Sequence, residues 1–411
     1  MKYDSNPFPR LELYQLMVVT LVFSIAFTMI NPILPLYIVE VGASELELGL
    51  IMAISSFSGI ILRIPFGMIS DRLGRKVVML FSLLTFSIAL ALLSVVKSIV
   101  WLYPTALLLS IPMASYMPSS TAAVMDLAPS KERGTTMGIY FTSFGTATIL
   151  GTLLTGILVK FLPYRLLFLI TSLFPMIALI ILIQGGLSRP LRSNSNIKSN
   201  LSTLSSIKRL IKSKSLVGLS LGRVLYSTSN FVFATLFPVY ANKDLLITAS
   251  TISFLYTARG LANALSRLPS GKLCDIVKPK RLLLLAYVIS SIFYLTIPSL
   301  RFLHLLFILM AIHGIAWGTR VVSDQTIAAE ILEPEVRGLG SAFLGTMFST
   351  GRFLGSLLAG VFATIMPIPN VIRIFGILPA IGSLIILLLV REDKKESPRV
   401  DEAEESGTMW H

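Results

Sequence analysis

The stretch "RIPFGMISDRLGRK" (63–76) decides how the rest of the chain is interpreted. It places five charged residues, a proline and two glycines between segments that are almost entirely apolar. The chain as a whole is 54% hydrophobic and only 14% charged, with a mean hydropathy of +0.80. A soluble domain cannot bury that much apolar surface. The sequence therefore predicts an integral membrane protein.

Apolar segments of membrane-spanning length follow one another along the chain. A helix needs about 20 residues to cross the hydrocarbon core of a bilayer. Helices are expected because a lipid-exposed backbone must satisfy its own polar groups. We predict an all-α membrane protein of twelve transmembrane helices, near residues 13–38, 48–69, 77–96, 102–125, 134–158, 165–184, 216–239, 248–270, 281–299, 304–327, 338–364 and 373–390.

The opening stretch returns 204 residues later as "RLPSGKLCDIVKPK" (267–280). The matching positions are Arg63 with Arg267, Pro65 with Pro269, Gly67 with Gly271, and Asp71 with Asp275. The same offset aligns "GTLLTG" (151–156) with "GSLLAG" (355–360). A six-helix unit has therefore been duplicated in parallel, which predicts two similar six-helix bundles.

The repeat divides the chain into five parts. They are a cytoplasmic N-terminus (1–12), an N-terminal bundle (13–184), a basic cytoplasmic linker (185–215), a C-terminal bundle (216–390) and a charged, disordered cytoplasmic tail (391–411). The linker is interpreted as a plain tether, with a regulatory role or a short amphipathic helix near 204–210 as alternatives.

The distribution of basic residues predicts the orientation. Most of the 35 Lys and Arg residues fall in segments that are cytoplasmic if both termini are inside. We therefore predict a multi-pass protein of the plasma membrane with both termini in the cytoplasm. The net charge of +14 is assigned to this topology and to anionic lipid head groups at the cytoplasmic face, and no nucleic-acid partner is expected.

Twelve spans, a basic middle linker and "GMISDRLGRK" (67–76) closely resemble the major facilitator superfamily, whose loop between helices two and three reads G-x-L-A-D-R-x-G-R-K. "DLAPSKERG" (126–134) resembles that family's link between helices four and five. The pattern is nearest to the twelve-helix drug-efflux-like branch. The resemblance implies alternating access, in which two bundles rock about a site near the bilayer midplane. Drug-exporting antiporters carry a Gly-Pro-x-x-Gly-Gly pattern where this chain reads "GTLLTG", so antiport is only weakly supported.

The resemblance also implies a conformational latch. In the family, the carboxylate that matches Asp71 faces the start of helix eleven, and the arginine that matches Arg75 orients it together with an acid matching Asp126. Retention of the loop inside is the alternative explanation for the basic residues. The latch candidates are Gly67, Asp71, Arg72, Arg75, Asp126 and Arg133. In the second copy Lys278 and Pro279 replace Gly74 and Arg75, so a second latch is not expected.

Charged residues inside the spans separate into two groups. Arg63 and Arg267 occur in both halves and are interpreted as structural. Arg223, Arg259, Arg320, Asp324 and Arg352 occur only in the second half and are costly within a membrane, so they are expected to serve the cargo. Arg223 lies nearest the cytoplasm and is expected to reach the head groups. The candidates for the substrate pathway are Arg259, Arg320, Asp324, Arg352, Tyr116 and Asn31.

Three arginines favour an anionic cargo. The alternative is an internal network in which Asp324 neutralises Arg320 four residues earlier on the same helical face. Asp324 and His313 are the candidates for proton coupling. Against this role, a nearby arginine would keep Asp324 ionised, and a lone histidine is more often a hydrogen-bonded core residue.

The predicted function is secondary active transport of a small organic solute, either an amphipathic drug-like compound or an organic anion. A proton-independent facilitator of an organic anion is the alternative. A nontransporting receptor or a lipid-modifying enzyme would be a different class. Enzymatic activity, a cofactor and a metal site are not expected, because the sequence has no metal-ligand cluster, nucleotide-binding glycine loop or nucleophile triad pattern.

Overall fold

The computed structural model describes residues 9–129, 133–185, 213–332 and 337–391, and it is all-helical over these ranges. The linker's predicted amphipathic helix, most of the predicted N-terminus and almost all of the predicted tail lie outside the described residues.

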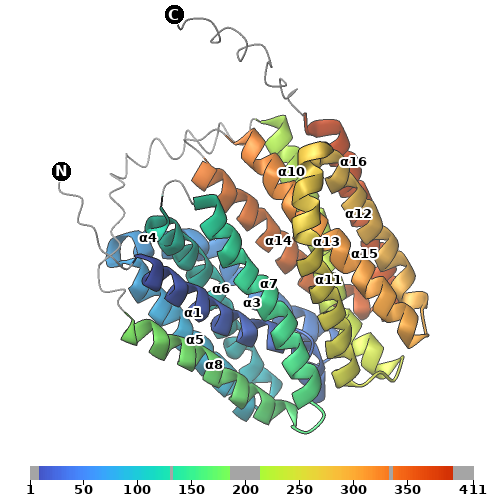
Figure 1. The fold of residues 1–411 in the computed structure, drawn as a ribbon. Coiled ribbons are helices and arrows are strands. Elements are labelled where there is room, and N and C mark those ends of the chain that lie inside the picture. Colours follow the sequence, from blue (N-terminus) through green and yellow to red (C-terminus); the bar gives the residue numbers. More distant parts are fainter. Residues whose placement is uncertain (1–8, 130–132, 186–212, 333–336, 392–411) are drawn as a thin grey trace, which may run out of the picture.

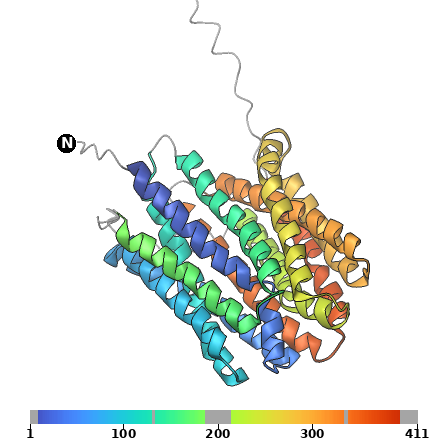
Figure 2. The same cartoon turned by 60° about the horizontal axis from the view of Figure 1, so that its bottom comes forward.

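Helices of the two sequence halves lie side by side in Figure 1, coloured blue to green and yellow to red, and Figure 2 shows the same division from below. The first half contains α1 (Pro9–Ile30), α2 (Leu34–Glu40), α3 (Glu45–Ile61), α4 (Arg63–Leu73), α5 (Arg75–Val95), α6 (Ile99–Leu127), α7 (Arg133–Leu158) and α8 (Tyr164–Gln184). The second half contains α10 (Lys214–Lys243), α11 (Ala249–Ile276), α12 (Pro279–Thr296), the 3-10 turn η1 (Ile297–Ser299), α13 (Leu303–Ile331), α14 (Arg337–Ala363), α15 (Ile368–Gly376) and α16 (Leu378–Leu389).

Many of the described helices are long and apolar enough to cross a membrane. By length and composition there are eight, or nine if α3 and α4 form one bent span. Helices α10, α11 and α14 are also long, with 30, 28 and 27 residues, but they carry arginines. At 1.5 Å per residue they extend about 40 Å, which exceeds a hydrocarbon core of about 30 Å. With these three, a described helix lies at each of the twelve positions where the sequence predicts a span.

The two copies of the opening stretch differ in their backbone. The span predicted at 48–69 is broken after Ile61, and the axes of its two parts differ by 54°. Pro65 follows the break and cannot donate a backbone hydrogen bond to the preceding turn. The matching Pro269 lies inside α11, which continues to Ile276. Gly74 ends α4 with φ 99°, whereas the matching Lys278 has φ −52°. Glycine at 74 therefore permits a turn that the second copy lacks.

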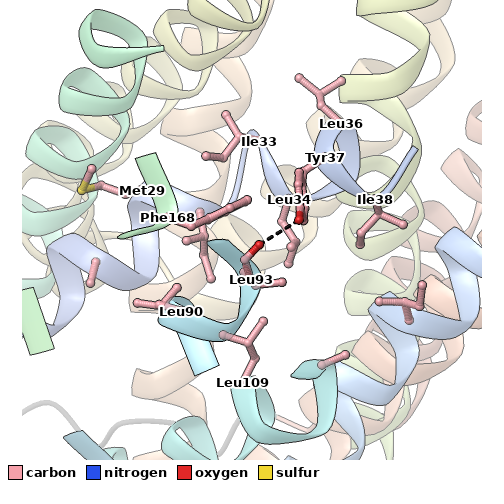
Figure 3. Packing of buried hydrophobic residues seen from close by; sticks show 14 of the residues in the cluster. Met29, Ile33, Leu34, Leu36, Tyr37, Ile38, Leu90, Leu93, Leu109 and Phe168 are labelled. Atoms are coloured by element: carbon pink, nitrogen blue, oxygen red, sulfur yellow. Dashed lines mark hydrogen bonds between the residues drawn. The ribbon is translucent and has the colours of Figure 1, made fainter. Parts of the chain in front are cut away.

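Tyr37 on α2 contacts two other helices of the first half, α5 and α8 (Figure 3). Its hydroxyl donates to the carbonyl oxygens of Leu93 (2.8 Å) and Val96 (2.9 Å), where α5 ends. Its ring packs edge-on against Phe168 of α8, with centroids 4.9 Å apart. Tyr37 is fully buried, so these contacts satisfy carbonyl groups that the end of α5 leaves without helical partners.

The two halves meet along two helix pairs, α3 with α14 and α7 with α11. Gly49 and Gly360 bring the backbones of the first pair together so closely that neither position has room for a Cβ atom. In the second pair, Ser250 Oγ donates to the carbonyl of Gly156 (2.6 Å). Toward the opposite end of the second pair, a Cβ atom added to Gly138 or Gly271 would meet nothing within 4 Å, whereas one added to Gly345 of α14 would clash with Arg63 of the first half. Among the described glycines, the backbones of the two halves therefore approach most closely at the end that holds Gly49.

Candidate functional site

One carboxylate lies between two arginine side chains in the second half. Asp324 on α13 accepts from Arg320 Nη2 (3.0 Å) one turn earlier, and from Arg223 Nε on α10 (2.8 Å). The side chains of Asp324 and Arg320 are 4% and 6% exposed. Asp324 therefore neutralises Arg320, as the internal-network alternative expected, but two cations share one anion. Arg223 contacts this network, whereas the sequence placed it at the head groups.

Aromatic rings cover the guanidinium group of Arg320. Its Cζ lies 4.8 Å from the ring centroid of Tyr226 on α10 and 5.5 Å from that of Phe348 on α14. Such contacts stabilise a desolvated cation by about 2 kcal/mol. The Nε atom of Arg320 is nevertheless buried without a hydrogen-bond partner among the described residues. Arg320 thus retains a donor that a bound anion could satisfy.

Arg259 on α11 is held by neutral groups. Its Nη2 donates to the amide oxygen of Asn230 on α10 (2.7 Å), and its Cζ lies 4.6 Å from the ring centroid of Trp317. The hydroxyl of Tyr294 also donates to that amide oxygen (3.3 Å). Within the described part of the chain, Arg259 has no ion-pair partner. Among the described residues, its buried positive charge therefore has no counter-ion.

Arg352 on α14 lies over the ring of Phe231 on α10, with Cζ 4.8 Å from the centroid. Its Nε atom is buried and has no hydrogen-bond partner in the described ranges. A further guanidinium group comes from the first half of the molecule. The Nη1 atom of Arg63 lies against Gly345 of α14, the helix that also carries Arg352. Arg63 was interpreted as structural because both halves carry an arginine there, but its surroundings differ from those of its copy.

His313 on α13 is fully buried and stacks on Phe293, with ring centroids 4.0 Å apart. Its Nδ1 and Nε2 atoms have no hydrogen-bond partner among the described residues. The sequence offered a hydrogen-bonded core histidine as the alternative to proton coupling. His313 is a core residue, held by ring stacking.

The two pathway candidates of the first half are separate from this cluster. Tyr116 on α6 is buried, bonds to Thr20 Oγ1 (3.0 Å) and stacks on Phe23. Asn31 is exposed in the turn between α1 and α2. Within the described ranges, no hydrogen bond or ion pair joins either side chain to the arginines of the second half. The structure thus brings Arg320 and Asp324 together, and leaves Tyr116 in a core.

Three of the six latch candidates are in contact with one another, through the side chain of Arg75. Arg75 at the start of α5 donates through Nη1 to Asp71 of α4, and through Nε to Asp126 of α6 (3.3 Å). Arg72 is exposed, and a Cβ atom on Gly67 would meet nothing within 4 Å. Arg133 begins α7, and its side chain lies outside the described part. The arrangement links the ends of three helices of the first half.

Sequence reasoning missed several partners of the arginines, namely Asn230, Trp317, Tyr226, Phe231 and Phe348. One signal was available for Asn230, because it follows Arg223 by seven residues and so lies on the same face of α10. The aromatic partners carry no such signal, because a membrane helix is rich in aromatic residues for packing alone.

Two similar helical halves in contact, with buried arginines in the second half, have the organisation of a polytopic membrane transporter. The family model described as "Major Facilitator Superfamily" matches residues 16–228 and 219–410. The chain belongs to the Major Facilitator Superfamily, whose members are transporters and not enzymes.

Individual proteins match over most of the chain. An uncharacterized MFS-type transporter of Methanocaldococcus jannaschii is 23% identical over 88% of this chain and 93% of its own length. A PmrA homolog of Lactococcus lactis, named a multi-drug resistance efflux pump, is 25% identical over 82% and 85%. The multidrug resistance protein MdtG of Enterobacter lignolyticus is 24% identical over 81% of each chain.

A solved structure has the same fold. It is a bacterial homolog of the human lysosomal transporter Spinster in an inward-facing, occupied conformation. The two structures superpose with a TM-score of 0.74, covering 94% of this chain and 96% of the other at 16% sequence identity. The all-helical major facilitator fold expected from the sequence is thereby confirmed.

Proposed function

We propose that this secondary transporter moves small amphipathic organic solutes across the plasma membrane by alternating access, and that organic anions are the favoured class. The observation that carries the proposal is the charge balance of the second half. Arg223, Arg259, Arg320 and Arg352 lie within its helices, and Asp324 is the carboxylate ion-paired with two of them among the described residues. Such an excess of buried positive charge is expensive unless an anion joins it.

The aromatic surroundings of the arginines favour a solute with an apolar body. Trp317, Phe231 and Phe348 each present a ring to a guanidinium group. Organic anions of this kind combine an acidic group for the arginines with a flat surface for the rings. The relatives named as multidrug proteins are consistent with amphipathic cargo, although those names describe the relatives themselves.

The proposal includes an orientation and a latch. Both termini and the basic linker 185–215 are placed in the cytoplasm, at anionic head groups. The end that holds Gly49 and Gly156 then faces outward, so the tightly packed end is the outer one and the structure corresponds to an inward-facing state. Asp71, Arg75 and Asp126 form the cytoplasmic latch of the first bundle, with Gly67, Arg72 and Arg133 beside it.

A proton-independent facilitator is the second candidate, and one observation favours it. Asp324 is ion-paired with two guanidinium groups, those of Arg223 and Arg320, and His313 is buried against a ring. A proton-coupling role for Asp324 would require both of these ion pairs to break during transport.

Flux into proteoliposomes tests the proposal. A naphthalenesulfonate keeps its charge at every working pH, so an effect of an imposed pH gradient reports on the protein and not on the solute. Saturable uptake of the sulfonate supports the proposal. Uptake at the same rate with and without the pH gradient favours the proton-independent facilitator. If a panel of organic anions and neutral drugs gives no protein-dependent flux, the transport function is wrong.

A further inference from the structure

Arg63 crosses from one half of the molecule to the other. It begins α4 in the first half, yet its Nη1 occupies the space beside Gly345 of α14 that a side chain at 345 would fill. Its Nε atom is buried and has no hydrogen-bond partner in the described ranges. The guanidinium of Arg63 therefore reaches the second half, where no described acidic residue pairs with it.

Arg352 lies on α14, the helix that Arg63 contacts. It follows Gly345 by two helical turns on the same face of α14. Side chains on a helix lean toward its N-terminus, which directs Arg352 toward the turn that contacts Arg63. Neither guanidinium has an ion-pair partner among the described residues.

The repeat-related interface lacks this arrangement. Positions 345 and 352 correspond to Phe141 and Thr148 on α7, which pairs with α11. Arg267, the copy of Arg63, donates from Nε to Asn263 Oδ1 of its own helix (3.2 Å). A purely structural arginine would be expected to have similar surroundings in both halves. The combination of Arg63 with Arg352 occurs only where the first half contacts α14, and not at the matching contact between α7 and α11.

We propose that Arg63 and Arg352 together bind the acidic group of an organic anion, and that the bound anion draws the two halves together. This inference rests on the proposed transport function and adds the residues that couple the solute to closure. Two like charges at one interface repel each other while the site is empty. An anion between them replaces repulsion by two charge-assisted hydrogen-bonding contacts, one from each half.

Binding of a naphthalenesulfonate tests the site, with the neutral naphthalenesulfonamide as the matched ligand. Arg63→Gln and Arg352→Gln are each expected to weaken sulfonate binding about thirtyfold or more, and to leave sulfonamide binding unchanged. Arg267→Gln is the matched control, since it removes the same residue type at the repeat position. Arg63→Lys keeps the charge and is expected to retain part of the sulfonate affinity. If Arg63→Lys and Arg63→Gln both lose all binding of both ligands, the loss is caused by misfolding and not by the missing charge.

Closure is measured separately with spin labels at Leu73 and Ile276, two exposed positions at the ends of α4 and α11. Cys274→Ser supplies a background without other thiols. The sulfonate is expected to shorten the distance between the labels in the unsubstituted protein and in Arg267→Gln, but not in Arg63→Gln. The inference is overturned if Arg63→Gln binds and closes normally, or if the unsubstituted protein binds no sulfonate. Continued flux of neutral solutes in that case would leave the transport function standing.

Discussion

Lys76 and Lys280 make the same contact in the two halves of the molecule. Lys76 Nζ donates to the carbonyl oxygens of Ile183 (3.5 Å) and Gly185 (3.4 Å), where α8 ends. Lys280 Nζ donates to those of Leu387 (3.0 Å) and Val390 (2.6 Å), where α16 ends. The last carbonyl groups of a helix lack partners and carry a partial negative charge, which an ammonium group neutralises.

This relationship predicts unequal effects of removing the two lysines. Lys280→Met is expected to lower stability by about 1 kcal/mol, and Lys76→Met by less, because the contacts of Lys76 are longer. Thermal unfolding in detergent measures both, with the exposed Lys97→Met as control. An effect of Lys76→Met that exceeds that of Lys280→Met would contradict the capping role.

Removal of the shared carboxylate tests the buried charge cluster. Asp324→Asn leaves Arg223 and Arg320 without their counter-ion and is expected to destabilise the protein by about 3–5 kcal/mol. Chemical unfolding in detergent measures the change. Glu330→Gln removes an exposed acid from the same helix and should have little effect. Equal stability of the two variants would show that Asp324 is not needed to neutralise the arginines.

The fork of Arg75 links two acids that belong to different helices. Arg75→Lys keeps the charge but cannot reach Asp71 and Asp126 together, so a loss of about 1–2 kcal/mol is expected. Arg72→Lys at an exposed neighbouring position is the control. Thermal unfolding distinguishes them. If the two variants unfold at the same temperature, the basic residues of this loop keep it in the cytoplasm and do not hold the helices together.

The close contact between Gly49 and Gly360 predicts sensitivity to a single methyl group. Gly360→Ala is expected to separate α3 from α14 at that end and to destabilise this conformation by about 1–3 kcal/mol. Gly271→Ala adds the same atom where nothing lies within 4 Å and serves as the control. Labelling of a cysteine introduced near Gly49, in the Cys274→Ser background, should rise only in Gly360→Ala. Unchanged accessibility would contradict the tight packing described for that end.

The sequence predicted the fold because its signals are local or periodic. Apolar runs of bilayer length give helices, and the offset that relates Arg63 to Arg267 gives two similar halves. The same offset pairs Ser87 with Ser291, which donate to the carbonyls of Ser172 (2.8 Å) and Gly376 (2.6 Å). Such matched contacts show that the duplicated sequence also keeps duplicated packing.

The site was only partly predictable. The pairing of Arg320 with Asp324 follows from helical spacing, but the contact of Arg223 with Asp324 depends on how α10 and α13 are rotated about their axes. Arg63 and Arg267 are identical in type and position, and only the break between α3 and α4 and the glycine at 345 separate their roles. These differences arise from tertiary packing, which the residue pattern of one helix does not encode.

The preference for organic anions is tested most directly by competition in proteoliposomes. Uptake of labelled naphthalenesulfonate is measured against an excess of an unlabelled organic anion or of neutral naphthalenesulfonamide, for the unsubstituted protein and for Arg259→Gln. We expect the anion to abolish uptake, the sulfonamide to compete weakly, and Arg259→Gln to lose most of the uptake while remaining folded. Equal competition by the two compounds, with full uptake by Arg259→Gln, would contradict the proposed anion selectivity.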